Sequence, residues 1–107
     1  MQVGRIDVLV VEDDTAVRTS TAAILRDAGY GVDEAEDGFV ALERLKEAPV
    51  GAVVLDVRME GLDGFGVLDK LEDPPPVVLV TVHEYDADVM AHRSKIVTYM
   101  QKAGPAT

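Results

Sequence analysis

Short apolar runs alternate along the chain with longer stretches in which apolar residues recur every three or four positions. A short apolar run is typical of a buried strand, and a three-to-four-residue repeat predicts an amphipathic helix. The apolar runs predict five strands, at residues 6–11, 30–35, 51–55, 77–80 and 96–100. The periodic stretches between them predict three helices, and residues 86–93 are a weaker candidate for a fourth.

Local signals mark where the first three helices begin and end. Asp14 or Thr15 can cap the first helix, which Gly29 ends, and Asp37 can cap the second, which Pro49 ends. The third helix ends before the proline run at 74–76. The first helix has an apolar stripe that we expect to face the core, made of Val17, Thr21, Ile24, Leu25 and Ala28.

Strands that alternate with helices over short loops predict an α/β fold, with a parallel sheet and helices on both faces. The length of 107 residues fits one domain, and we expect residues 1–107 to contain no separate output domain. The hydrophobic content of 48% favours a folded globular protein over a disordered acidic chain.

The formal net charge of -10 disfavours direct binding to nucleic acid or to an anionic membrane. The chain has no cysteine, which excludes disulfides and thiolate sites and is compatible with a reducing compartment. The apolar runs are shorter than the roughly 20 residues that span a bilayer. We therefore expect a cytoplasmic protein that does not enter a membrane.

Carboxylates stand at the ends of two apolar runs. Glu12 and Asp13 follow the first run, and Asp56 follows the third. Ligands bind outside the carboxyl ends of neighbouring strands in an open parallel sheet, so these side chains can meet in one crevice. Three carboxylates in one crevice predict a site for a divalent cation. Thr81 and Lys102 follow the fourth and fifth runs and complete a set suited to phosphoryl transfer.

Three motifs make the chain resemble the receiver domains of response regulators in two-component signalling: Val-Val-Glu-Asp-Asp at 10–14, Leu-Asp-Val-Arg-Met at 55–59 and Tyr-Met-Gln-Lys at 99–102. The resemblance runs from Arg5 to Lys102. It implies a flavodoxin-like, doubly wound sheet of five parallel strands in the order 2-1-3-4-5. It also implies a histidine kinase or phosphotransfer protein as the partner.

The resemblance assigns roles to individual residues. Asp56 would be the phosphoacceptor, and Thr81 and Lys102 would contact the phosphoryl group. Mg²⁺, or Mn²⁺, would be held by the carboxylates of Asp13 and Asp56 and by the backbone carbonyl of Arg58, with Glu12 acting directly or through water. Tyr99 would be an aromatic switch that turns inward after phosphorylation.

The chain departs from the receiver pattern at several positions. Glu60 stands where the family has proline, Val82 is bulkier than the usual small residue, and Ala103 replaces the proline that usually follows the lysine. The last helix of the family is missing or truncated, because only five residues follow Lys102. Its absence would expose apolar surface, and a homodimer that covers this surface is our hypothesis.

Three functions remain open at this stage. The first is a phosphoacceptor module that is not an enzyme beyond its own phosphorylation and dephosphorylation. The second is a phosphorylation-independent interaction or dimerisation domain, and the third is a small metal-dependent phosphohydrolase, which we disfavour because the chain is too short for a lid. Asp14 is assigned to helix capping, Thr81 and Tyr99 have structural alternatives as a β-former and a core residue, and His83 and His92 are expected to be solvated.

Overall fold

The computed structural model describes residues 6–81 and 87–101. Its strands are β1 (Ile6–Val11), β2 (Val32–Ala35), β3 (Val50–Asp56), β4 (Val77–Thr81) and β5 (Thr98–Gln101). Its helices are α1 (Thr15–Asp27), α2 (Gly38–Glu47), α3 (Gly64–Asp69), α4 (Ala87–Ala91) and the short 3-10 helix η1 (Arg93–Lys95). The alternation of strands and helices predicted from the apolar pattern is confirmed.

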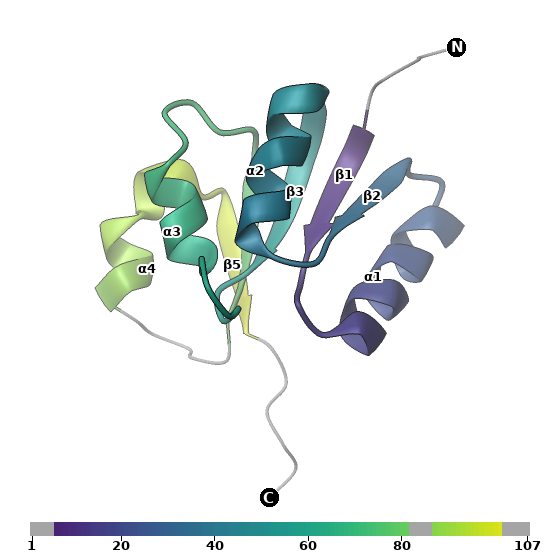
Figure 1. Cartoon of the computed structure of the whole chain (residues 1–107), viewed down its shortest axis with the longest axis horizontal. Helices are drawn as coiled ribbons and strands as arrows, with labels where there is room; N and C mark the ends of the chain where they lie inside the picture. The colour runs from purple at the N-terminus through teal and green to yellow at the C-terminus, as the bar shows by residue number, and fades with distance from the viewer. Residues whose placement is uncertain (1–5, 82–86, 102–107) are drawn as a thin grey trace, which may run out of the picture.

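The five strands form one parallel sheet in the order β2-β1-β3-β4-β5 (Figure 1). This order confirms the flavodoxin-like fold. Val11 pairs with Leu55 across β1 and β3, and Asp56 pairs with Val80 across β3 and β4. The carboxyl ends of the three central strands therefore lie at one edge of the sheet.

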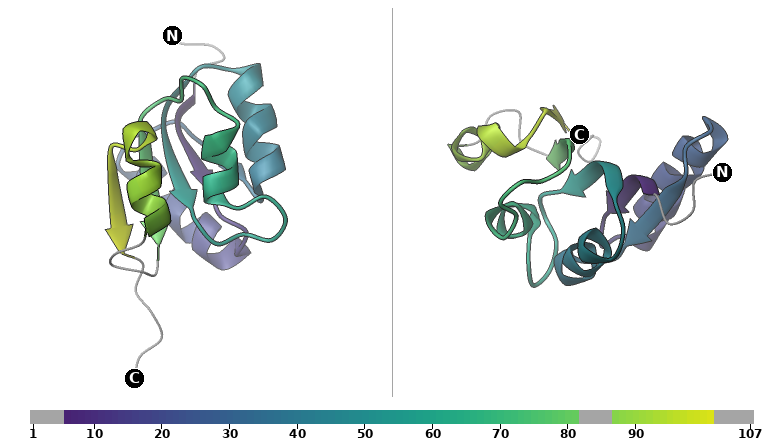
Figure 2. Two further views of the ribbon diagram at one scale, coloured as in Figure 1. Left: turned by 90° about the vertical axis from the view of Figure 1, so that its left-hand side faces the viewer. Right: turned by 90° about the horizontal axis from the view of Figure 1, so that it is seen from above.

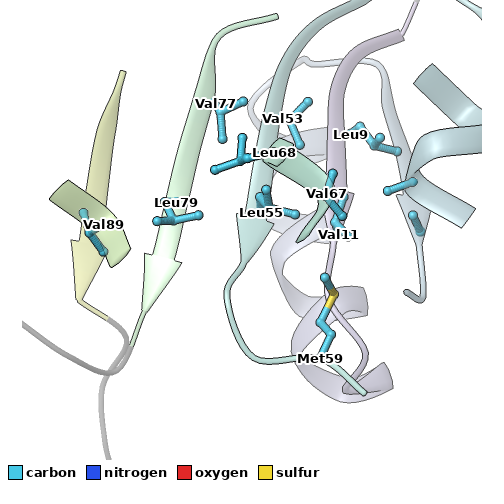
Figure 3. Close-up of a cluster of buried hydrophobic side chains, with 12 residues drawn as sticks. Leu9, Val11, Val53, Leu55, Met59, Val67, Leu68, Val77, Leu79 and Val89 are labelled. Atoms are coloured by element: carbon cyan, nitrogen blue, oxygen red, sulfur yellow. The ribbon is translucent and has the colours of Figure 1, made fainter. Parts of the chain in front are cut away.

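Helices α2, α3 and α4 cover one face of the sheet, and α1 lies on the other (Figure 2). The main core lies under the first group of helices. Leu55 and Leu79 of the sheet are almost fully buried there, together with Val67 and Leu68 of α3 and Val89 of α4 (Figure 3). Burial of these apolar side chains stabilises the face that carries α2, α3 and α4.

The face that carries α1 is only partly covered. A groove of about 350 Å³ runs along it, with an apolar lining of Val10, Val11, Val17, Leu25, Val54, Val78, Val80 and Met100. Among the described residues, α1 is the only helix on this face, and it packs mainly against β1 and β2. The apolar surface of β4 and β5 beside it is therefore accessible to solvent.

The predicted inward stripe of the first helix is wrong at Val17, Ile24 and Ala28. Val17 is 36% exposed, Ile24 is 70% exposed and Ala28 is exposed, whereas Ala22 is the fully buried residue of α1. The reason is that α1 packs mainly against β1 and β2, so apolar residues on the rest of its surface stay in solvent. The related expectation of a missing last helix concerns residues 102–107, which lie outside the described residues.

The predicted helix caps are confirmed. A side-chain oxygen of Asp14 accepts a hydrogen bond from the backbone N–H of Val17 at 3.0 Å, and Asp37 accepts one from Val40 at 2.8 Å. The predicted second strand begins too early, because Gly29 adopts a φ of 101° and Tyr30 still closes the end of α1. The fifth strand likewise begins at Thr98 rather than at residue 96.

The fourth helix is shorter than predicted. Helix α4 ends at Ala91, and the chain then continues through His92 into η1. The predicted start at residue 86 lies outside the described residues. None of the helices in the described part of the chain is long and apolar enough to span a bilayer.

Candidate metal centre

Three carboxylates meet at the carboxyl edge of the sheet. Glu12 and Asp13 follow β1, Asp56 ends β3, and one oxygen from each side chain lies within 4.8 Å of the other two. Glu12 and Asp56 are each 5% exposed, whereas Asp13 is exposed. Oxygen ligands in such a cluster suit a hard divalent cation such as Mg²⁺. The structure thus brings together the three acidic residues that the sequence analysis singled out.

Backbone hydrogen bonds hold Glu12 in place. Its N–H donates to the carbonyl oxygen of Ala35 at 3.1 Å, and its own carbonyl accepts a hydrogen bond from Nη1 of Arg18 at 2.9 Å. The Oε2 atom of Glu12 also accepts from the N–H of Asp14 at 3.2 Å. The contact of Arg18 could not be predicted, because nothing in the sequence pattern of α1 separates Arg18 from a solvated arginine.

The start of α3 packs directly on the backbone of Asp56. The N–H of Gly64 donates to the carbonyl oxygen of Val57 at 2.9 Å. A Cβ atom at Gly64 would lie 2.5 Å from the carbonyl oxygen of Asp56, which is closer than real Cβ atoms come. Only glycine therefore fits here without moving Asp56 or α3. The sequence signal was a glycine directly after Asp63, which caps α3 through the N–H of Gly66.

A cleft of about 530 Å³ lies beside the carboxylates. Its lining includes Asp13 and the loop after β3, together with α3 and α4, through Val57, Arg58, Met59, Glu60, Asp63, Phe65 and Asp88. Met59 is 8% exposed and anchors this loop in the core. Glu60, the departure from the receiver pattern noted above, is exposed and adds negative charge to the cleft. The cleft therefore combines four carboxylates with the guanidinium of Arg58.

The remaining candidate residues lie at the same edge or outside the described residues. Thr81 ends β4 and is 3% exposed, beside the strand that carries Asp56. Tyr99 pairs with Leu79 in the sheet, but its side chain is outside what the structure describes. Lys102 lies outside the described residues, as do Val82, His83 and Ala103.

The expectation that His92 is solvated is wrong. Its side chain is 16% exposed, and its ring lies 4.9 Å, centroid to centroid, from the ring of Phe65. Phe65 lines the cleft, so His92 lies behind the wall of the candidate site. Sequence analysis placed His92 in a helix but could not find this contact, because Phe65 belongs to a different element.

Comparisons of sequence and of structure with known proteins all find response regulators or their receiver domains. The family model described as "Response regulator receiver domain" matches residues 8–105. The transcriptional regulatory protein FixJ of Bradyrhizobium diazoefficiens is 38% identical over 79 residues, which cover 71% of this chain and 38% of that protein. AfsQ1 of Streptomyces coelicolor is 37% identical over 84 residues, covering 77% of this chain and 37% of that protein.

Solved structures resemble the whole fold. A receiver protein domain from Methanoculleus marisnigri superposes with a TM-score of 0.82 at 28% identity, covering 92% of this chain and 85% of that one. The response regulator TrrA of Thermotoga maritima, in complex with Mg²⁺ and BeF, gives a TM-score of 0.77 at 29% identity and covers 92% and 86%. The chain spans only 16% to 38% of the length of the curated relatives that it matches.

Proposed function

Because the chain belongs to the response regulator receiver domain family, we propose that Asp56 accepts a phosphoryl group from a histidine kinase in a Mg²⁺-dependent reaction. The observation that carries this proposal is the meeting of Glu12, Asp13 and Asp56 within 4.8 Å at the edge of the sheet. Receiver domains are signalling modules, and a relative such as the methylesterase of Anaeromyxobacter dehalogenans matches this chain over only 21% of its own length. Enzymatic activity on an external substrate is therefore not part of the proposal.

The donor set fits Mg²⁺ or Mn²⁺. The carboxylates of Asp13 and Asp56 would hold the ion, the backbone carbonyl of Arg58 would add an oxygen, and Glu12 would act directly or through water. Asp13 is exposed and gives access from solvent, whereas the other two carboxylates are buried. When bound, the divalent ion would neutralise negative charge on the phosphoryl oxygens.

The reaction needs a nucleophile and a leaving group that can keep the electron pair of the broken bond. A carboxylate oxygen of Asp56 attacks the phosphorus atom of a phosphohistidine and forms an acyl phosphate. The phosphorus–nitrogen bond breaks, and the imidazole of the donor keeps the electron pair and takes up a proton. Thr81 donates its hydroxyl to a phosphoryl oxygen, Lys102 pairs with the same anion, and Tyr99 reports the change to a partner.

The charge of the cleft indicates what the phosphodonor protein presents. Four carboxylates, those of Asp13, Glu60, Asp63 and Asp88, share this cleft with Arg58. A histidine kinase or phosphotransfer protein that docks here gains from cationic side chains around its phosphohistidine, since complementary charges steer the encounter. We propose a cytoplasmic location for this encounter, in keeping with the absence of cysteine.

Incubation with acetyl phosphate and Mg²⁺, followed by intact-mass measurement, tests the proposal. We expect one added phosphoryl group on the wild type and none on Asp56→Asn or in the presence of a chelator. Asp73→Asn is the matched control, because it removes an exposed carboxylate far along the chain from the site. Unchanged mass in the wild type, with folding and metal binding verified, would refute phosphoryl transfer to this domain.

A second function is favoured by one observation, the apolar groove beside α1. A homodimer formed through this groove would let the domain act as a phosphorylation-independent interaction module. Sedimentation velocity over a concentration series tests it with Met100→Glu, because Met100 lines the groove and is 59% exposed. Phe39→Glu is the control on α2, across the sheet. Loss of a dimer in Met100→Glu alone supports this function, and a monomer at all concentrations rules it out.

A further inference from the structure

Both ring nitrogens of His92 face oxygen atoms. Nδ1 lies 2.7 Å from the backbone carbonyl oxygen of Asp88 in α4, and Nε2 lies 2.8 Å from Oδ1 of Asp69, the last residue of α3. Asp69 and His92 are 23 residues apart in the sequence. His92 therefore connects two helices that pack side by side against the sheet (Figure 1).

The two partners of His92 define how many protons its ring carries. A backbone carbonyl only accepts hydrogen bonds, and so does an ionised carboxylate. Nδ1 must donate to Asp88, and Nε2 must donate to Asp69. Both nitrogens carry a proton only in the imidazolium form, so the observed contacts are complete only when His92 is positively charged.

The charged groups around the ring support this protonation state. Burial of the ring opposes its charge, but the hydrogen bonds to Asp88 and Asp69 and the charges of both carboxylates outweigh burial and raise the pKa of His92. Asp69 faces the ring from α3, and Asp88 faces it from α4. On the η1 side Lys95 turns to α3, where its Nζ donates to the carbonyl oxygen of Leu68 at 2.9 Å, and Arg93 is an exposed neighbour in the chain.

His92 also contacts the wall of the cleft. Its ring packs against Phe65 with an angle of 32° between the ring planes. Phe65 and Asp88 both line the cleft that holds Asp13 and Arg58. The same side chain thus joins α3 to α4 and supports two of the residues that shape the approach to the carboxylates.

We propose that His92 is a positioning residue for this cleft: as an imidazolium it holds α4 against α3 and sets the wall formed by Phe65 and Asp88. Loss of a ring proton replaces one of the two hydrogen bonds by a contact between a nitrogen lone pair and an oxygen atom, and it removes the positive charge that pairs with Asp69, which weakens the hold of the ring on α3. The cleft wall then changes with pH. We call the contacts of His92 with Asp69 and Asp88 the clamp. The clamp does not depend on the proposed phosphorylation, and only its effect on phosphodonor access rests on that function.

An NMR titration of the full chain tests the clamp without any phosphoryl chemistry. We expect the ring signals of His92, assigned by their loss in His92→Gln, to titrate above the ordinary histidine pKa, and Asp69→Asn to lower the midpoint by about half a pH unit or more. The ring signals of Phe65 should follow the same midpoint. Those of Phe39, which is 58% exposed on α2, should not. The proposal is overturned if Asp69→Asn leaves the His92 midpoint unchanged, or if the Phe65 ring signals do not change at that midpoint.

The pH profile of phosphorylation by acetyl phosphate tests the effect on access. We expect the wild-type rate to fall above the His92 midpoint, the fall to begin at lower pH in Asp69→Asn, and the step to disappear in His92→Gln. A step that persists unchanged in His92→Gln overturns the positioning role. If no phosphorylation occurs in any variant, the proposed function fails, and the Phe65 titration still decides whether His92 positions the cleft wall.

Discussion

Burial separates the roles of the three carboxylates. Glu12 and Asp56 are nearly enclosed, and Asp13 lies open to solvent at the same cluster. A buried carboxylate next to like charges is costly unless it is paired or coordinates a cation. The cluster therefore suits a site in which Asp13 admits the ion and the buried Asp56 holds a defined position for attack on phosphorus.

Asp13→Asn should weaken Mg²⁺ binding and also stabilise the metal-free protein. The substitution removes a ligand, and it removes repulsion between charges about 5 Å apart, which near water is worth about 1 kcal/mol. Urea unfolding with and without Mg²⁺ measures both effects. Wild type should gain stability from Mg²⁺, because a ligand that binds only the folded state stabilises it. Asp27→Asn is the control, and an equal gain from Mg²⁺ in Asp13→Asn would contradict the assignment.

Thr81→Ala should slow phosphorylation by about tenfold or more, because a buried hydroxyl that donates to developing negative charge is lost. Thr81→Ser keeps the hydroxyl and should retain most of the rate. The comparison of the two initial rates with acetyl phosphate decides the point. Equal rates in the alanine and serine variants would show that Thr81 serves only as a strand residue.

The sequence could predict residues whose chemistry depends on their position in one element. Asp56 and Glu12 stand at the ends of apolar runs, and Asp14 and Asp37 stand where caps are needed. It could not predict His92 as a packed residue, because its partner Asp69 is 23 residues away and the contact exists only after α3 and α4 have packed together. A lone histidine in a weak helix carries no signal of such a contact.

At the level of elements, the junction between β3 and α3 holds the site. Gly64→Ala should destabilise the fold by about 2 kcal/mol and impair phosphorylation, because the new methyl group would lie against the backbone of Asp56. Gly66→Ala on the same helix is the matched control. Its methyl group would meet the tip of the Leu62 side chain, which can move. Urea denaturation of both variants gives the comparison, and equal losses would argue against a special role for Gly64.

The contact between α3 and α4 should make stability depend on pH. The pKa of His92 is raised in the folded state, so its contribution is complete below the ordinary histidine pKa and is lost as pH rises through the folded value. Asp69→Asn should cost about 0.5 kcal/mol at pH 6 and less at pH 9, in the range of a largely exposed ion pair. Unfolding curves at the two pH values measure the difference. The opposite trend would rule out this account.

Helix boundaries show where local patterns stop being informative. The caps of α1 and α2 follow from single residues, and the structure has both. The inward stripe of α1 was wrong at Ile24, because periodicity shows that a helix has an apolar side without showing how much of that side a neighbour covers. Partial cover of α1 by β1 and β2 is a tertiary property.

At the scale of the whole molecule, the apolar pattern predicts the α/β class, and the resemblance to receiver domains supplies the strand order β2-β1-β3-β4-β5. That order places β1 beside β3 and thereby brings Glu12 and Asp13 to Asp56. The two faces of the sheet differ, with a filled core under α2, α3 and α4 and an apolar groove beside α1. Glu12 and Asp56 also line the groove, so the proposed dimer contact lies directly beside the proposed phosphoryl chemistry.

The most direct measurement is to locate the phosphoryl group on the chain. After phosphorylation by acetyl phosphate and Mg²⁺, borohydride reduction converts an acyl-phosphorylated aspartate to homoserine, and peptide mass spectrometry identifies the residue. We expect homoserine at position 56 alone, with Asp13 and Asp63 unchanged. Homoserine at any other position, or at none while the intact mass has increased, would contradict Asp56 as the phosphoacceptor.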